Sequence, residues 1–502
     1  MATPRRQPHP SLSLTRLLRT AGAVVLLALV AGCATNPVTG EQDFVLLSED
    51  QEIRIGRQEH PKILERFGRY PDEALQEYVQ SLGEELAAES HRTDLIYRFT
   101  VLDSPDVNAF ALPGGYIYIT RGLMAYLDTE AELAAVLGHE LGHVTARHSV
   151  RQVSAAQAMD LGFTLGSIFA PELRQQGVQD LFNVLGTALV RGYGREHELE
   201  ADRLGAGYLA RTGRDPRAML EVLRVLKAQE QFAKQQAEEE GREPSSYHGL
   251  FATHPDNDRR LQEVIQAAGG LRPAGGGQPP RREAYLRRLE GLTFGPSARQ
   301  GVLRGSRFFH KDLDFGLSFP PQWRVENRPD RLVATAPGGA AVLQMTVEDR
   351  NKRIGPEAFL RRRLERERLA EGRPVSPAGL EGYTGVTALQ TPFGRRQARV
   401  GVVFHGRRAF LFLTAAKAER EPADLREDFL ATVESFHPLT AREQELAEPL
   451  RIQVITAERG RGYAELANGS RIPHHPEAQL RLLNQDYPDG RPRPGELIKI
   501  VK

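Results

Sequence analysis

One stretch of the chain decides the fold: Glu130-Ala-Glu-Leu-Ala-Ala-Val-Leu-Gly-His139-Glu140-Leu-Gly-His143-Val-Thr-Ala-Arg147. Residues four apart lie on one face of an α-helix, so the imidazoles of His139 and His143 can meet at one ion with Glu140 beside them. Zinc in proteins prefers a tetrahedron of ligands, and a reactive site keeps one position for water. The stretch therefore predicts a helical metal site that needs a third ligand from elsewhere in the chain.

Length and composition limit the number of domains and the class of protein to which this site belongs. The chain has 502 residues, which is long enough for two to four domains. Hydrophobic residues make up 40%, charged residues 26% and aromatic residues 7%, as is ordinary for globular proteins. The formal net charge is +1, so bulk electrostatics give no reason to expect a nucleic-acid partner.

Cys33 is the only cysteine, so no disulfide forms within the chain. It follows an apolar run at residues 21–32, which is itself preceded by four arginines. A basic region followed by about ten apolar residues is typical of a secretory signal, and it is too short to cross ~30 Å of hydrocarbon as a helix. The ending Val30-Ala-Gly-Cys33 resembles a bacterial lipobox. That resemblance implies a signal peptide at 1–32, cleavage before Cys33 and lipidation of its sulfur; an uncleaved membrane anchor is the alternative.

Such processing would leave the protein tethered to a membrane in the periplasm. The residue after the cysteine is Ala34 rather than an acidic residue. By resemblance to enteric bacteria, this favours sorting to the outer membrane. Residues 33–48 are expected to form a tether, because Pro37 and Gly40 argue against regular structure there.

Two helices and two strands are expected before the metal-binding stretch. Residues 49–67 and 72–89 carry apolar side chains at helical spacing, and residues 96–102 and 115–120 are β-rich. The connection at 106–115 is either a plain hairpin loop or the rim of a cleft. In the second interpretation, the second strand is a free edge that a substrate backbone extends. Candidate substrate-binding residues are then Asn108, Ala109, Tyr116 and Tyr118.

A strongly apolar region follows between Ala155 and Val190. It is consistent with a buried helical hairpin, a lid over the site, or a surface that leans on a membrane or a partner. Core or dimer packing is the default expectation for such a region.

The third ligand is sought between Tyr193 and Gly205, where carboxylates are dense. A run of charges usually marks a solvated helix face. Here, however, Glu198 and Asp202 lie four apart on a helix that otherwise shows small residues for close packing. One carboxylate can bind the metal while another orients a ligand histidine. On the residues alone, Glu196 and Glu200 are rival ligands.

Three motifs together resemble the M48 family of zinc metallopeptidases, in its bacterial periplasmic and lipoprotein branch. They are His139-Glu-Leu-Gly-His143, Asn108-Ala-Phe-Ala-Leu-Pro-Gly-Gly115 and Glu198-Leu-Glu-Ala-Asp202. The resemblance runs from about residue 36 to residue 261. It implies an α+β multidomain protein whose residues 49–266 form a mainly helical, zincin-type metallopeptidase domain with a small β-sheet.

The resemblance also implies roles for individual residues. His139, His143 and Glu198 match the ligands of one Zn²⁺ ion, Glu140 matches the catalytic glutamate, and Asp202 matches an acid expected to support a ligand. Zinc lowers the pKa of a bound water far below that of bulk water, to about 7. Glu140 is expected to accept the proton of that water and pass it to the leaving amine.

His254 and Arg260 lie in a segment, Thr253-His-Pro followed by arginine, that resembles one in family members. Two roles for His254 stay open: it stabilises the oxyanion, or it occupies the fourth zinc position and keeps the enzyme latent. Arg260 is expected to anchor the segment against a carboxylate. A lone histidine in such a loop is otherwise an ordinary surface residue.

Three further parts are expected after this domain. Residues 267–304 are a linker and bridging segment, rich in glycine and proline. Residues 305–440 are an α/β accessory domain that resembles the PsbP/Mog1-type sandwich. Residues 450–502 resemble a small βααβ LysM module, but Arg459-Gly-Arg-Gly462 departs from the usual Gly-Asp-Thr, which leaves peptidoglycan binding in doubt.

The sequence thus predicts a lipid-anchored periplasmic zinc endopeptidase. The family resemblance implies a role in envelope protein quality control, with unfolded or misassembled envelope proteins as substrates. The alternative is a latent chaperone or assembly factor for outer-membrane proteins that keeps the same fold. The oligomeric state is left open.

Overall fold

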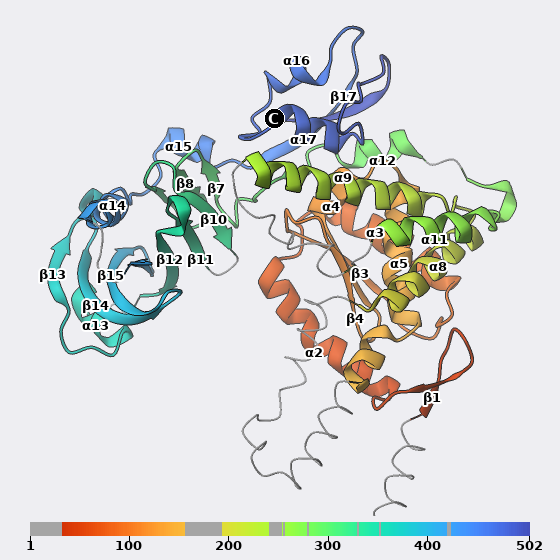
Figure 1. Ribbon diagram of the computed structural model, residues 1–502, viewed down its shortest axis with the longest axis horizontal. Helices are drawn as coiled ribbons and strands as arrows, with labels where there is room; N and C mark the ends of the chain where they lie inside the picture. The colour runs from red at the N-terminus through yellow and green to blue at the C-terminus, as the bar shows by residue number, and fades with distance from the viewer. Residues whose placement is uncertain are drawn as a thin grey trace, which may run out of the picture.

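The computed structural model describes residues 33–155, 193–239, 254, 257–278, 281–328, 331–350, 353–418 and 423–502. Helices and sheets are mixed, as expected, with a helical region around helix α5 and a large sheet to one side of it (Figure 1). Strand β17 (Leu450–Thr456) and helices α16 (Tyr463–Ala467) and α17 (Pro476–Leu483) lie above the helical region in Figure 1. Among the described residues, no helix has the length and apolarity needed to cross a membrane.

Helix α5 (Glu130–Thr145) is the centre of the helical region, and all 16 of its residues are buried. Thr129 caps it, since its side chain accepts a hydrogen bond from the backbone N–H of Glu132. The helices expected before it are confirmed as α2 (Glu49–Phe67) and α3 (Glu73–Ala88). The others around α5 are α4 (Arg121–Tyr126), α8 (Arg195–Arg211), α9 (Ala218–Glu239) and α11 (Asn257–Gly269).

The small sheet of this region has the order β3-β5-β4, with β3 at Arg98–Leu102, β4 at Ala109–Leu112 and β5 at Tyr116–Thr120. Strand β5 pairs in parallel with β3 and antiparallel with β4. The prediction that residues 115–120 form a free edge is therefore wrong. The connection before β5 folds into a strand of its own, and this strand, β4, takes the edge position among the described strands.

The two faces of β5 pack against different helices. Ile117 and Ile119 belong to the main core with α3 and α5, whereas Tyr116 and Tyr118 pack on the α2 side. The tyrosines are 4% and 0% exposed, and Tyr118 contacts His60 of α2 through its hydroxyl at 2.8 Å. Because alternate side chains of a strand point to opposite faces, both tyrosines point away from α5. Their predicted role in substrate binding is therefore wrong.

Helices α5 and α8 meet along a seam of small residues. Gly138 and Gly142 on α5 face Ala201 and Gly205 on α8, in each case one helical turn apart. A Cβ atom added at Gly205 would lie 2.9 Å from the backbone nitrogen of His139. This close approach brings the carboxylates of α8 to the histidines of α5.

Gly205→Ala is expected to lower the free energy of unfolding by about 1–3 kcal/mol, because the added methyl group overpacks the seam. Gly207→Ala is the matched control, since its Cβ would have no atom within 4 Å. That change should stabilise the helix by up to about 1 kcal/mol. Urea unfolding followed by circular dichroism measures both. Equal stabilisation by the two substitutions would contradict the close seam.

The predicted tether at 33–48 is a short hairpin instead. Strands β1 (Cys33–Thr35) and β2 (Gln42–Phe44) pair antiparallel. The carbonyl oxygen of the Asn36 side chain accepts hydrogen bonds from the next turn, and Gly40 supplies the positive φ of 73° that closes it. The predicted signal peptide at 1–32 and the apolar region from Ala155 to Val190 lie outside the described residues, except for Ala155 itself.

The C-terminal segment packs directly on the helical region. Strand β17 (Leu450–Thr456), helices α16 (Tyr463–Ala467) and α17 (Pro476–Leu483) and strand β18 (Leu497–Val501) follow the expected βααβ order. Their apolar side chains join the same core as those of α3, α4 and α5. The likeness to LysM stays a prediction.

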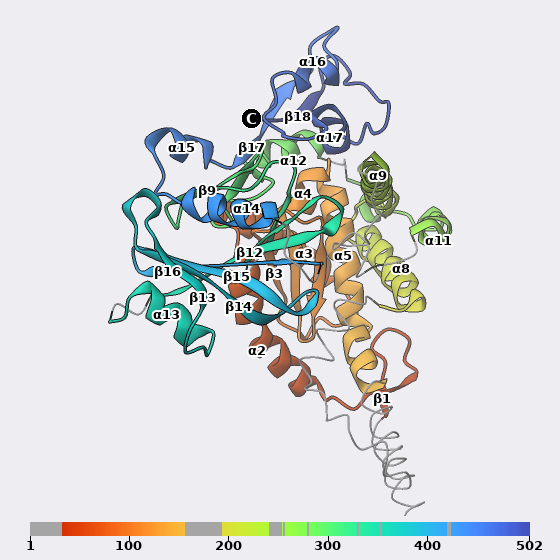
Figure 2. The ribbon, with the colours of Figure 1, turned by 60° about the vertical axis from the view of Figure 1, so that its left-hand side comes forward.

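The segment predicted as a linker contributes to this core. Helix α12 (Arg282–Arg288) buries Tyr285 and Leu286, and strand β6 (Thr293–Phe294) pairs with β17. It therefore ties the helical region to the C-terminal strands, and both ribbon views show α12 near α17 (Figure 1 and Figure 2).

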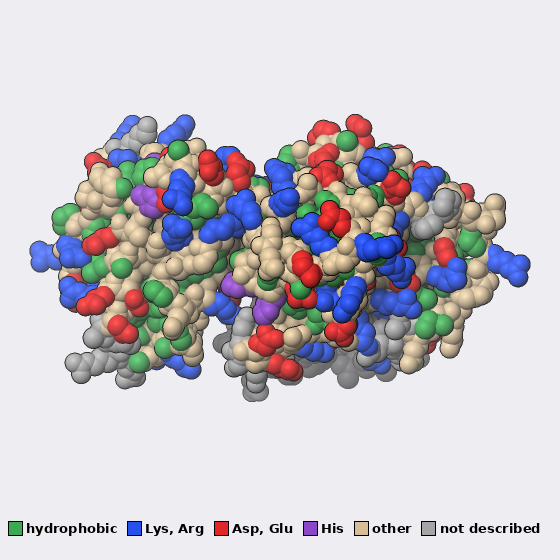
Figure 3. All heavy atoms as spheres, turned by 90° about the horizontal axis from the view of Figure 1, so that it is seen from above, with side chains coloured by type: hydrophobic (Ala, Val, Ile, Leu, Met, Phe, Trp, Pro, Cys, Tyr) green, Lys and Arg blue, Asp and Glu red, His purple; other side chains and the backbone are tan. Residues whose placement is uncertain are grey.

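The accessory region contains a seven-stranded antiparallel sheet of order β10-β11-β12-β16-β15-β14-β13 and a three-stranded sheet β7-β8-β9. On β15, Val400 and Val402 pack with α13, whereas Val403 packs with α14. The helices thus cover opposite faces of the sheet. Seen from above, this region and the rest of the molecule form two lobes (Figure 3). The elements are β7 Val302–Arg304, β8 Arg307–His310, β9 Phe315–Ser318, β10 Arg324–Arg328, β11 Arg331–Thr335, β12 Ala341–Asp349, α13 Pro356–Arg363, β13 Ala370–Val375, β14 Gly382–Thr391, β15 Gly394–His405, β16 Arg408–Ala416, α14 Ala423–Glu434 and α15 Ala441–Leu446.

Candidate metal centre

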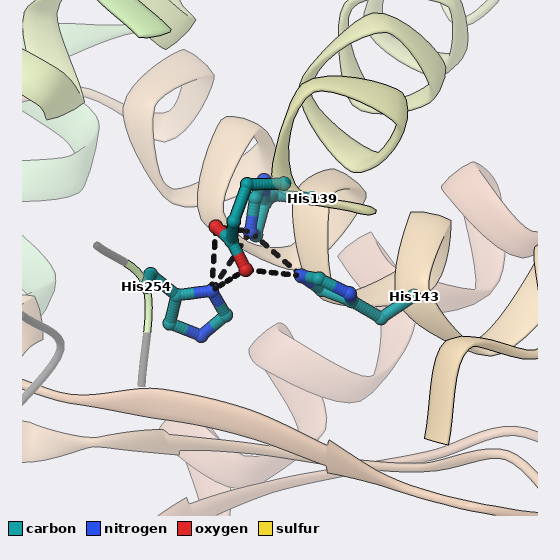
Figure 4. A group of neighbouring side chains, drawn as sticks. His139, His143 and His254 are labelled. Atoms are coloured by element: carbon teal, nitrogen blue, oxygen red, sulfur yellow. Dashed lines mark hydrogen bonds and ion pairs between the residues drawn. The ribbon is translucent and has the colours of Figure 1, made fainter. Parts of the chain in front are cut away.

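Three segments bring four ligand side chains to one point. Helix α5 supplies His139 and His143, helix α8 supplies Glu198, and His254 comes from the chain just before α11. All four side chains are buried, and their ligand atoms lie within 4.8 Å of one another. The three histidine rings point toward a common centre (Figure 4).

The spacing of these atoms fits a tetrahedral cation. The Nε2 atom of His139 lies 3.0 Å from His143 Nε2 and 3.2 Å from His254 Nδ1. Oxygens of Glu198 lie 3.0 Å from His254 and 3.5 Å from His139 and His143. Ligands arranged tetrahedrally at about 2.0–2.1 Å from zinc are separated by about 3.3 Å. Three imidazole nitrogens and a carboxylate are also a donor set that zinc prefers.

The rival carboxylates lie elsewhere. Glu196 is exposed, and Glu200 binds His148 rather than the ligand group. Glu198 is fully buried within the group. Among the residues that the structure describes, no other cluster of metal-ligating side chains is found.

Asp202 and Arg260 hold one ligand in place. Asp202 Oδ1 lies 2.8 Å from Nδ1 of His139, which leaves Nε2 of that ring for the metal. Arg260 donates two hydrogen bonds to Asp202, each 2.7 Å long, and also contacts Glu198 at 3.1 Å. Arg260 thus lies against a carboxylate, as expected, and ties α11 to α8.

Burial and neighbouring charges set the protonation of the ligands. Burial alone would raise the pKa of Glu198, but His254 and Arg260 outweigh it and hold that pKa well below its ordinary value. Burial alone would lower the pKa of His139, but Asp202 raises it to about 9. For His143 burial prevails and its pKa is well below the ordinary value. Because zinc binds the unprotonated nitrogen, zinc binding at His139 would release a proton.

Glu140 lies beside the ligand group with a free oxygen. Its Oε1 is 3.4 Å from Nε2 of His254, while its Oε2 and that Nε2 have no hydrogen-bond partner within the described chain. Burial raises the pKa of Glu140, although the charges of His254 and His139 oppose the increase. A buried carboxyl group with a raised pKa and an unpaired oxygen is suited to exchange protons with a bound water or an amine.

A pocket of about 330 Å³, counted with its open mouth, adjoins this group. Its polar wall is formed by His139, Glu140, His254 and Arg260. Apolar side chains of α5 and α9 form the remainder: Ala135, Val136, Met219, Val222, Leu223 and Leu226.

Two residues that sequence reasoning missed also contact the histidines. Tyr193 stacks on His143 with ring centroids 4.0 Å apart, and His148 contacts the Nδ1 atom of the same ring at 2.8 Å. His148 stands five residues after His143, and this nearness of a third histidine was the available signal. Ala109 is the first residue of the edge strand β4 and Asn108 directly precedes it, whereas Cys33 opens β1.

The comparison with known families agrees with this geometry. Residues 73–268 match the sequence model of Peptidase family M48. That segment contains the three ligands expected from the sequence, together with Glu140, Asp202, His254 and Arg260. The predicted M48 resemblance is confirmed for this segment.

Several proteases are similar to this chain. The Beta-barrel assembly-enhancing protease of Yersinia pestis is 30% identical over 246 residues, which are 47% of this chain and 48% of that protein. Its Escherichia coli K12 counterpart is 30% identical over 275 residues, covering 53% and 54%. The Mitochondrial metalloendopeptidase OMA1 of Arabidopsis thaliana is 32% identical over 182 residues, covering 36% and 33%. The chain spans about half the length of the bacterial relatives that it matches.

Solved structures are less informative. Cyanobacterial PsbP from Synechocystis is matched over 28% of this chain and 95% of its own, with 13% identity and a TM-score of 0.22. A score this low does not establish a shared fold. The PsbP/Mog1 likeness of residues 305–440 therefore stays a prediction.

Proposed function

We propose that this protein is a zinc-dependent endopeptidase that hydrolyses peptide bonds of unfolded or misassembled envelope proteins. The observation that carries the proposal is the buried group of four ligand atoms with Glu140 beside it. The match of residues 73–268 to Peptidase family M48 supports the same chemistry. The names of the bacterial relatives support a role in the envelope.

The residues divide the work of hydrolysis. His139, His143 and Glu198 would hold one zinc ion, which when bound polarises a carbonyl oxygen and makes a water molecule more acidic. Glu140 takes the proton of the attacking water on its free oxygen. Its raised pKa makes the carboxylate a stronger base for this proton, which it then passes to the leaving amine in the second half of the reaction. Asp202 and Arg260 keep His139 oriented throughout.

The surroundings of the site suit a peptide with an apolar side chain. The pocket beside Glu140 is walled mostly by aliphatic side chains of α5 and α9, so it favours an aliphatic substrate side chain next to the cleaved bond. We keep Asn108 and Ala109 as proposed substrate contacts. Ala109 begins the strand at the sheet edge, where an extended peptide can pair, and Asn108 directly precedes it.

Digestion of unfolded casein tests the proposal. The purified full chain with zinc should cleave casein, a zinc chelator should stop the cleavage, and added zinc should restore it. Glu140→Gln should be inactive although it binds zinc. Cleavage that survives both chelation and the Glu140 substitution would refute the proposed active site.

His254 supports a resting form of the site. Its Nδ1 atom lies 3.2 Å from His139 Nε2 and 3.0 Å from Glu198, as expected of a fourth ligand. In this position it would take the place that water needs. We therefore propose that His254 keeps the site latent until its side chain leaves the ligand group. The same observation supports the alternative function, a latent chaperone or assembly factor with a metallopeptidase fold.

His254→Ala is expected to raise casein cleavage. If the latent form outnumbers the open one by about ten to one, the increase is about tenfold. The initial rate of casein cleavage at saturating zinc measures it. A loss of activity would instead assign His254 to the oxyanion, and an unchanged rate would exclude both roles.

The proposal includes the cellular location of the protein. Lipidation of Cys33 would attach the chain to a membrane, with the outer membrane favoured. The β1–β2 hairpin lies next to the catalytic region. Asp43 pairs with Arg151 at 3.4 Å, and Ser154 accepts a hydrogen bond from the backbone N–H of Leu46. Cleavage would therefore take place near the membrane surface.

A further inference from the structure

The two histidines of α5 are each held at Nδ1 by a different kind of side chain. Asp202 holds His139 at 2.8 Å, and His148 holds His143 through its own Nδ1 atom, also at 2.8 Å. His148 is fully buried. His148 thus occupies the same position relative to His143 as Asp202 does relative to His139. The difference is that His148 is a neutral imidazole, whereas Asp202 is a carboxylate.

The hydrogen bonds around His148 fit one assignment of protons. His143 turns its Nε2 atom toward the ligand group, so its hydrogen is on Nδ1 when Nε2 binds a metal. His148 must accept that hydrogen on Nδ1 and therefore carries its own on Nε2. This Nε2 lies 3.1 Å from Oε2 of Glu200, which accepts the bond. A continuous series of hydrogen bonds therefore runs from His143 through His148 to Glu200.

The neighbours keep these groups in place. Arg151 donates to Glu200 at 3.3 Å. His197 stacks on His148 with ring centroids 4.3 Å apart and an angle of 16° between the rings. Tyr193 stacks on His143, with an angle of 19° between the two rings. Ring planes and hydrogen bonds are thus fixed together.

We infer that His148, oriented by Glu200, is a positioning residue of the metal centre that fixes the tautomer and ring plane of His143. The inference rests on the proposed zinc site. Loss of a side chain that holds a metal ligand typically costs 10–100-fold in metal affinity. The sequence left Glu200 as a rival metal ligand. In this inference Glu200 instead acts on the metal centre indirectly, through His148 and His143.

Two substitutions at His148 separate positioning from packing. In His148→Asn, the amide oxygen lies near the position of Nδ1 and can accept the hydrogen of His143. In His148→Gln, the longer side chain carries its amide toward the position of Nε2 instead. His197→Phe is the control, because it keeps the ring stack and removes both ring nitrogens next to His148.

The zinc dissociation constant of each full-length variant is measured by competition with a chromophoric chelator. The melting temperature is measured in EDTA. We expect His148→Gln to weaken zinc binding by about 10–100-fold, and His148→Asn and His197→Phe to stay within about threefold of the wild type. All should melt in EDTA within a few degrees of one another.

Two results would overturn the inference: wild-type affinity in His148→Gln, or equal losses in Asn and Gln that follow a lower melting temperature in EDTA. The measurement needs no proteolysis. A protein whose zinc affinity depends on His148 but that cleaves no casein would refute the proposed function and keep this inference. A wild-type protein that binds no zinc would refute both.

Discussion

Glu140→Gln is expected to slow casein cleavage by about 10²–10⁴-fold while the protein still binds zinc. The amide has nearly the shape of the carboxylate, so the packing around α5 is kept. It has no basic oxygen, however, and cannot take a proton from the attacking water. The rate at saturating zinc and the zinc content are measured on the same preparation.

The control for this substitution is Glu196→Gln, on the exposed face of α8. It should leave both the rate and the zinc content unchanged. If Glu140→Gln retained more than about a tenth of the wild-type rate, another group would have to be the base. The buried, unpaired Oε2 atom would then lack a role in catalysis.

Lys499→Met is expected to destabilise the catalytic region by about 3 kcal/mol, the lower end of the cost of breaking a buried ion pair. Lys499 is fully buried and donates hydrogen bonds of 2.8 Å to the carbonyl oxygens of Ala125 and Leu127. Its Nζ also lies 2.9 Å from Asp128, two residues before α5 begins. The lower end applies because Arg282 still pairs with Asp128.

Urea unfolding followed by circular dichroism measures the loss, with the exposed Lys502→Met as the control. Tryptophan fluorescence is not suitable. The only tryptophan, Trp323, packs in the accessory region and reports on that part of the molecule. A change below about 1 kcal/mol would mean that β18 does not brace the start of the catalytic helix.

Local patterns in the sequence predicted which side chains gather at the candidate metal centre. The four-residue spacing of His139 and His143 fixes which face of α5 they share, and the same spacing on α8 brings Glu198 and Asp202 together. The small residues of α8 indicated close packing, which the seam at Gly205 explains. These features depend on neighbours along one helix, which the sequence displays directly.

Long-range neighbours were not predictable in the same way. The alternation of Tyr116 to Thr120 shows that β5 has two faces, but it does not show which strands flank it or which helix covers each face. Lys499 and Asp128 meet across 371 positions of sequence. Composition alone suggested a flexible linker, whereas α12 and β6 are held by core contacts that only the folded chain provides. His148 went unnoticed because its partner Glu200 lies on a different helix.

The zinc content of purified Glu198→Ala, measured by elemental mass spectrometry beside wild type and Glu196→Ala, tests the central claim most directly. The account predicts about one zinc ion per chain in the wild type and in Glu196→Ala, because three side chains and water or His254 complete the tetrahedron. It predicts almost none in Glu198→Ala after dialysis. Stoichiometric zinc in Glu198→Ala would contradict the metal centre described above.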